Sequence, residues 1–125
     1  PVQEVTERDA TVRDAGALRV VLCTCPSEEA AATIARALVE EGLAACVNLV
    51  PGVRSIYAWQ GAVCDDAEVL CVMKTARDRL DALTARIVAL HPYTCPEVIA
   101  LPVSEGVAPY VAWVLAGTRP AREVL

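Results

Sequence analysis

The chain has 125 residues, enough to bury the core of one domain and too few for two. Its net charge of −5, from 16 acidic and 11 basic residues with no Lys/Arg run, argues against nucleic-acid binding. No apolar run approaches the roughly 18 residues that span a bilayer, and the first 17 residues lack the pattern of a secretory signal. We therefore expect a cytoplasmic protein with neither a nucleic-acid nor a membrane partner.

The hydrophobic content is high for a monomer of this size. Hydrophobic residues make up 55% of the chain, and the mean hydropathy is +0.42. So small a domain cannot hide that much apolar surface inside itself. We expect part of this surface to lie between subunits.

Six cysteines allow about 15 pairings in an oxidising compartment. With no CxxC pair and no export signal, we instead expect mostly buried free thiols in a reducing compartment. The residues are Cys23, Cys25, Cys46, Cys64, Cys71 and Cys95.

The first elements follow from periodicity and punctuation. Residues 1–16 are polar and lack periodicity, so they are predicted to form a flexible arm before a domain at 17–118. The apolar run 18–25 is predicted to be a central strand. A helix should follow, from an N-cap at Ser27 to a stop at Gly42. Its expected buried stripe is Ala30, Ile34, Ala37 and Leu38.

The middle of the chain indicates a long β-ribbon. Residues 43–59 have strand character, with a bulge or bend expected at Pro51-Gly52. Gln60-Gly61 is typical of a hairpin turn, and 67–75 is the expected partner strand.

The remaining elements complete a familiar order. A second helix is predicted over 77–91, closed by Pro92, with a last core strand over 98–103. Residues 109–115 suit a short helical turn, and 119–125 form a tail. The order β-α-β-β-α-β predicts an α+β fold of the ferredoxin-like, split βαβ type: an antiparallel sheet with two helices on one face. The other face is also apolar and needs a partner.

Several motifs together resemble one family. They are Thr24-Cys25-Pro26, Leu43 to Asn48, Pro51 to Tyr57, Lys74-Thr75, His91-Pro92-Tyr93, Pro96-Glu97 and Leu101-Pro102-Val103. In order and spacing they resemble the CutA divalent-ion tolerance family, over about 18–115. The resemblance implies a non-catalytic homotrimer linked to tolerance of divalent ions, copper especially.

Candidate metal ligands are His91 and Cys23. An imidazole and a thiolate both suit copper, and the resemblance places Cys23 at a first-strand cysteine treated as a copper ligand in some members. Some members carry a second histidine where Leu90 stands here, so we expect copper or another divalent cation to bind weakly, with no required cofactor. Alternatively, His91 completes a helix end and Cys23 is an inert packing residue. Cys25 shares the strand face of Cys23, and the two either share a soft metal or pack together.

A second candidate site is a cleft between subunits. Tyr57 and Trp59 lie on one strand face and need shelter in an interface or a ligand cleft. The resemblance places Lys74 and Glu97 at polar positions of the inter-subunit cleft, where they either bind a ligand or form an ion pair.

Three functions can be compared. The first is a metal-binding trimer. The second is a small-molecule sensor resembling the trimeric PII signalling proteins, although no GxxxxGK[ST] phosphate loop is present. The third is a phosphatase of the acylphosphatase kind, for which neither an anion-binding loop nor an activated nucleophile is apparent. The sequence favours the first and predicts no enzyme.

Overall fold

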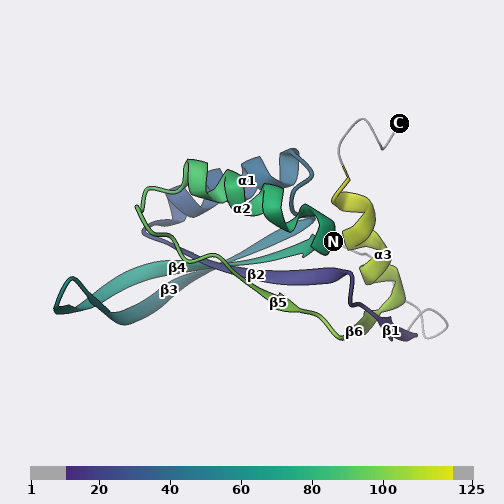
Figure 1. Cartoon of the computed structure of the whole chain (residues 1–125), viewed down its shortest axis with the longest axis horizontal. Helices are drawn as coiled ribbons and strands as arrows, with labels where there is room; N and C mark the ends of the chain where they lie inside the picture. Colours follow the sequence, from purple (N-terminus) through teal and green to yellow (C-terminus); the bar gives the residue numbers. More distant parts are fainter. Residues whose placement is uncertain (1–10, 120–125) are drawn as a thin grey trace.

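Two helices cover one face of a four-stranded antiparallel sheet (Figure 1). The computed structural model describes residues 11–119. The sheet has the order β3-β4-β2-β5. Its strands are β2 (Leu18–Cys25), β3 (Cys46–Trp59), β4 (Ala62–Ala76) and β5 (Ile99–Pro102), and the covering helices are α1 (Glu28–Glu40) and α2 (Leu80–Leu90). The predicted ferredoxin-like, split βαβ fold is confirmed.

Helix α1 begins where the sequence predicts. The Ser27 hydroxyl accepts a hydrogen bond from the Ala30 N–H at 3.1 Å, which satisfies one of the free donors of the first turn. The buried residues are Ala31, Ile34, Ala35 and Leu38. The predicted stripe was therefore correct for Ile34 and Leu38. It was wrong for Ala30 and Ala37, which are only half-buried, because the buried face is centred on the i, i+3, i+4, i+7 row that starts at Ala31.

The second predicted helix is divided in two. A 3-10 turn, η2 (Arg77–Arg79), precedes α2, and the helix ends at Leu90. His91 has φ −74° and ψ 137°, an extended conformation. Pro92 explains this, since a proline disfavours helical geometry in the residue before it. The chain therefore leaves the helix at His91. The imidazole of His91 lies buried against the sheet.

Strands β3 and β4 form a long hairpin whose tip extends beyond the helix layer (Figure 1). The expected bulge is present as a register shift between Val50 and Val53, with Gly52 at φ +76°. Gln60 and Gly61 both have positive φ, as a two-residue type I′ turn requires. Pairing therefore begins directly after the turn, and β4 is longer than the predicted strand at 67–75.

The chain outside this core is more ordered than predicted. Strand β1 (Val12–Asp14) pairs with β6 (Glu105–Val107), and Ala15 is buried. The prediction of a flexible arm over 1–16 was therefore wrong for residues 12–15, because a three-residue strand is too short to show periodicity; residues 1–10 lie outside the described range. Helix α3 (Ala108–Gly117) is longer than the turn expected at 109–115. Of the predicted tail, Arg119 pairs with Asp78 at 2.8 Å, and 120–125 lie outside the described range.

The two faces of the sheet differ in what covers them. On the helix side, Val21, Cys23 and Cys25 pack with residues of α1 and α2 in the main core. The residues between them on β2 face the other way, and the register aligns them with apolar residues of the neighbouring strands. We call this second surface the open face; its apolar residues are Val20, Leu22, Val50, Leu70, Val72, Ile99 and Leu101. Ile99 and Leu101 are 52% and 49% exposed.

Candidate metal centre

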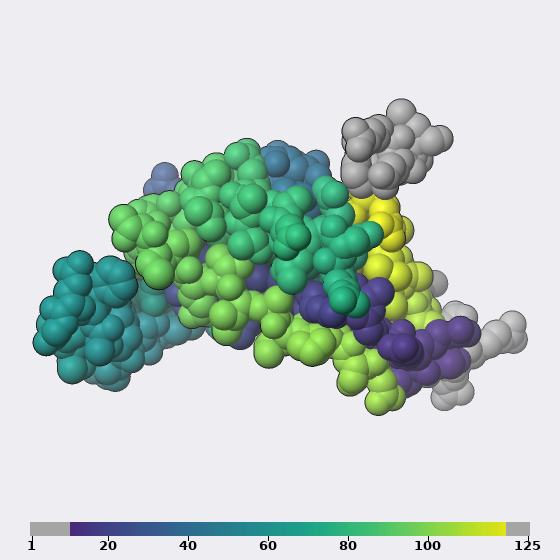
Figure 2. Space-filling view, in the orientation of Figure 1, coloured from purple at the N-terminus to yellow at the C-terminus, as the bar shows by residue number. Residues whose placement is uncertain are grey.

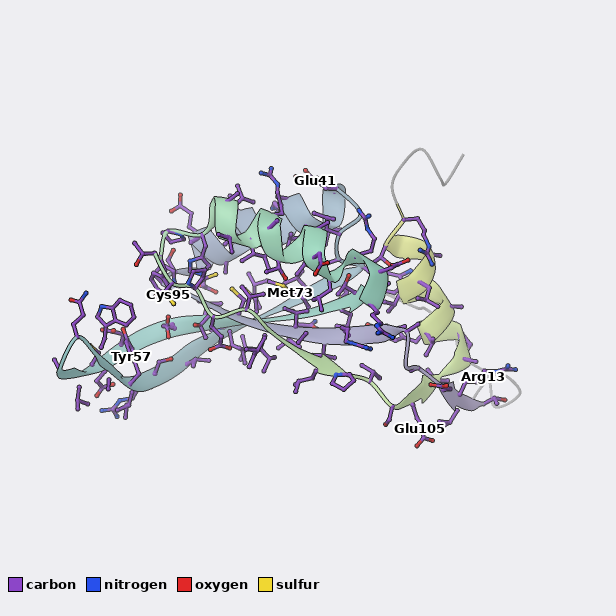
Figure 3. The ribbon with its side chains drawn as sticks, viewed as in Figure 1. Arg13, Glu41, Tyr57, Met73, Cys95 and Glu105 are labelled. Atoms are coloured by element: carbon purple, nitrogen blue, oxygen red, sulfur yellow. The ribbon has the colours of Figure 1, made fainter. Side chains whose placement is uncertain are left out.

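Three potential metal ligands meet between the sheet and the helices. Cys23 and Cys25 are alternate residues of β2 and point to the same side of the sheet, while His91 follows α2. The two sulfur atoms and the nearest imidazole nitrogen all lie within 4.8 Å of one another. All three residues are buried, and Figure 3 shows sulfur atoms between the sheet and the helix layer. The structure thus brings the two predicted residues, Cys23 and His91, together and adds Cys25.

Both nitrogens of the His91 ring already have hydrogen-bond partners. Nε2 donates to the Thr24 carbonyl at 2.8 Å, and Nδ1 accepts from the Tyr93 N–H at 3.1 Å. These bonds define a neutral ring with its proton on Nε2. Nε2 also lies 3.7 Å from the Cys25 sulfur. To ligate a metal through Nε2, the ring must lose that proton and the bond to Thr24.

A third buried thiol extends the cluster. Cys71 lies directly opposite Cys23 in the β2–β4 register and is fully buried. Hydrogen bonding from Cys23, and then from Cys71, lowers the pKa of the Cys25 thiol, with burial opposing it. The pKa values of Cys23 and Cys71 are both raised, first by their hydrogen bonds to Cys25 and then by burial. These opposite pKa shifts favour a Cys25 thiolate that accepts hydrogen bonds from the thiols of Cys23 and Cys71.

The donor set fits a soft metal ion. Thiolates prefer Cu(I) and Zn(II), and imidazole suits both copper and zinc. With metal–sulfur and metal–nitrogen bonds of about 2.3 and 2.0 Å, two donors on one ion lie roughly 3.5–4.0 Å apart. The 3.7 Å between the Cys25 sulfur and His91 Nε2 falls in this range, and the 4.8 Å limit for the whole cluster requires only a small contraction. The residues present can therefore hold such an ion without moving the backbone far.

A cavity of about 710 Å³ lies on the other side of Thr24. It lies between the β3–β4 hairpin and residues 92–97, and Figure 2 shows the hairpin tip (teal) standing out as a lobe beside them. Of the predicted cleft residues, Tyr57, Trp59 and Glu97 line it.

Lys74 lies elsewhere. It is on β4 opposite Val20 and Cys46, and its ammonium donates to the Asn48 side chain. Within one subunit it does not meet Glu97, so the predicted pairing of Lys74 with Glu97 across subunits stays a prediction.

Among the cavity residues that sequence reasoning missed, Glu68 and Tyr93 form a hydrogen-bonded pair. Glu68 is 8% exposed and accepts a hydrogen bond from the Tyr93 hydroxyl at 2.7 Å. Both residues line the cavity. Glu68 follows an exposed stretch of β4 and precedes its apolar part, so an acidic residue at the start of a buried run was the available signal.

Fold and cluster together define a class: a ferredoxin-like α+β domain with a buried cysteine–histidine centre under its helices. The family model for the CutA1 divalent ion tolerance protein matches residues 19–116. The chain belongs to this family, as the sequence motifs predicted.

Curated relatives and solved structures agree with this assignment. The chain is 57% identical over 99 residues to the divalent-cation tolerance protein CutA of Thermus thermophilus, covering 79% of this chain and 96% of that protein. The solved structure of the Thermus thermophilus protein matches with a TM-score of 0.80 and 55% identity, over 82% of this chain and 99% of that one. CutA from Synechococcus elongatus matches with a TM-score of 0.84 and 34% identity, over 88% and 97%.

A longer relative is the human protein CutA. It is 50% identical over 99 residues, which are 79% of this chain and 55% of the human protein. The chain therefore spans about half the length of its human relative and nearly all of the bacterial one.

Proposed function

We propose that this protein acts in divalent-cation tolerance by binding copper at the buried cluster, with Cys23 and Cys25 as the main ligands and His91 as the third. The observation that carries the proposal is the convergence of these donors within 4.8 Å, all buried. Two thiolates favour Cu(I), the oxidation state that soft ligands select. Leu90 offers no donor, and His91 gives up a hydrogen bond to bind, so affinity is modest.

The same geometry supports a non-catalytic role. A cysteine beside a histidine is also the arrangement of a thiol nucleophile and its base. Here the Cys25 sulfur is fully buried, and both His91 nitrogens are held by backbone groups. A nucleophile must reach a substrate, whereas a metal ion can be enclosed completely. Burial therefore favours metal binding over catalysis.

Self-association into a homotrimer is part of the proposal. The open face presents Ile99 and Leu101 about half exposed, next to Val20 and Leu22 on the adjoining strand. An apolar sheet face left in water is costly, and a second copy of the chain would cover it. This accounts for the hydrophobic content that one small domain cannot bury.

We propose the cytoplasm as the compartment. All six cysteines are free thiols, the state that a reducing compartment maintains. Within residues 11–119, no helix combines the length and apolar character needed to cross a membrane. A relative from Archaeoglobus fulgidus, 30% identical to this chain, is described as periplasmic. A different compartment is therefore named for at least one member of the family.

A small-molecule sensor of the PII-like kind is the second candidate. The cavity beside the hairpin supports it, because about 710 Å³ is a usual size for a ligand site.

The metal proposal is tested by native mass spectrometry with Cu(I), Cu(II) and Zn(II) added in turn. We expect one Cu(I) per chain. Cys23→Ala should lower the Cu(I) affinity at least about a hundredfold and His91→Ala about tenfold, since the imidazole binds only after losing an existing hydrogen bond.

Cys64→Ala is the matched control, because Cys64 is a free thiol on the hairpin away from the cluster. Copper that stays bound in Cys23→Ala but is lost in Cys64→Ala would place the site on the surface and overturn the proposal.

A further inference from the structure

Aromatic rings and carboxylates line the cavity beside the hairpin. Tyr57 and Trp59 of β3 supply two aromatic rings, and Tyr93, in the segment after α2, supplies a third. Carboxylates come from Glu68 of β4 and from Glu97. Figure 3 labels Tyr57 on the hairpin and Cys95 on the segment that faces it, which marks the two sides of the space.

The charge of the cavity has one sign. Within residues 11–119, Glu68 and Glu97 are the only charged side chains that line it, and neither forms an ion pair with a described basic residue. Glu68 is only 8% exposed, and its one side-chain hydrogen-bond partner is the neutral Tyr93 hydroxyl. A carboxylate held in so dry a place is costly without a positive partner.

A carboxylate outside the cavity lining holds the Tyr57 side chain at the wall. The Tyr57 hydroxyl donates to Asp66 at 2.5 Å, and this bond, followed by partial burial and the nearby negative charge, raises the pKa of Tyr57 to about 12. With two carboxylates and no cationic side chain among its described lining residues, the cavity is electrostatically complementary to a cation.

We propose that this cavity binds a small organic ammonium ion, held over the rings of Tyr57, Trp59 and Tyr93 and paired with the carboxylates of Glu68 and Glu97. Aromatic faces attract cations, Trp most strongly, and quaternary ammonium groups are bound in proteins by such combinations of rings and carboxylates. A hard inorganic ion would need several oxygen ligands around it, whereas three aromatic rings together with Ile56 and Pro92 form much of this wall. The shape and chemistry therefore favour an ion with an apolar body.

The cavity adjoins the metal cluster through Tyr93, whose N–H donates to His91 Nδ1 and whose ring centroid lies 4.7 Å from that of His91, but none of the three proposed metal ligands lines the cavity. Thr24 lines the cavity, while its neighbours Cys23 and Cys25 face the helices on the opposite side of the same strand. The inference does not depend on copper binding, and all measurements are made with a chelator present. Failure of one proposal thus leaves the other intact.

The test uses choline as the probe and 3,3-dimethylbutan-1-ol as its uncharged isostere. Isothermal titration calorimetry should show choline binding at least about tenfold more tightly than the alcohol, because only choline carries the charge. In ¹H–¹⁵N NMR spectra, choline should shift the indole resonance of Trp59 and leave in place that of Trp113, which belongs to α3 and does not line the cavity.

Variants locate the site. Glu68→Gln and Trp59→Leu should each weaken choline binding about five- to tenfold. Glu97→Gln, a change at an exposed position, serves if Glu68→Gln does not fold. Glu105→Gln, on β6 away from the hairpin, is the control and should bind choline as the unaltered protein does (Figure 3). Equal affinity for choline and the alcohol, or an unmoved Trp59 resonance, would overturn the inference.

Discussion

Replacing Ile99 and Leu101 together by Asp should convert the proposed homotrimer into monomers. Both side chains lie on the open face and are about half exposed in the single chain. Burying each against another subunit contributes about 1.5–3 kcal/mol, and a carboxylate in the same place must be dehydrated without a partner. Every subunit carries both substitutions, so the loss of interface free energy occurs at each contact between subunits. Light scattering should show the mass fall from three times 13.3 kDa to 13.3 kDa.

The matched control places the same charge on the helix surface. Val39 of α1 and Val88 of α2 are 44% and 54% exposed, comparable with the two residues of β5. Val39→Asp with Val88→Asp should leave the mass at three chains. An unaltered protein that already scatters as a 13.3 kDa monomer, or a β5 variant that stays trimeric, would show that the open face is not the interface.

His91→Ala should lower the free energy of unfolding by about 2–4 kcal/mol even when no metal is added. The substitution removes two hydrogen bonds, to the Thr24 carbonyl and from the Tyr93 N–H, and leaves both backbone groups without these partners. It also empties the space of a ring that is 7% exposed. Urea unfolding at one fixed protein concentration measures the change, since an oligomer's stability depends on concentration.

Two comparisons sharpen this result. Val88→Ala, at an exposed position of α2, the helix that precedes His91, should change stability by less than about 0.5 kcal/mol. His91→Gln, which can still donate and accept, should recover part of the loss. If His91→Ala is as stable as the unaltered protein, the ring has no structural role, and the hydrogen bonds to Thr24 and Tyr93 contribute nothing measurable.

Local chemistry made most of the fold predictable. Ser27 as a cap, the bulge at Pro51-Gly52 and the turn at Gln60-Gly61 each depend on residues adjacent in sequence, and all three are present. Strand β1 was not predictable, because three residues carry no period and its ordering comes from pairing with β6, over 90 residues away in sequence. The early start of β4 was missed for another reason: residues 62–67 are mostly exposed and show no apolar alternation, although they pair outward from the turn.

The candidate site was predictable only as separate parts. Cys23 and Cys25 share a strand face by simple alternation, and His91 is the one histidine. That His91 reaches the two sulfurs depends on the helix ending at Leu90, one residue earlier than predicted, and on the packing of α2 over β2. Cys71 was expected only as one of the mostly buried free thiols, because its position opposite Cys23 depends on the register between distant strands.

X-ray absorption at the copper edge, on protein loaded with one equivalent of Cu(I), tests the central claim most directly. If Cys23 and Cys25 hold the ion, the first shell contains two sulfur atoms at about 2.3 Å, and the double variant Cys23→Ala with Cys25→Ala loses them. A first shell of nitrogen and oxygen alone at about 2.0 Å, unchanged in the double variant, would contradict the account and place the copper outside the buried cluster.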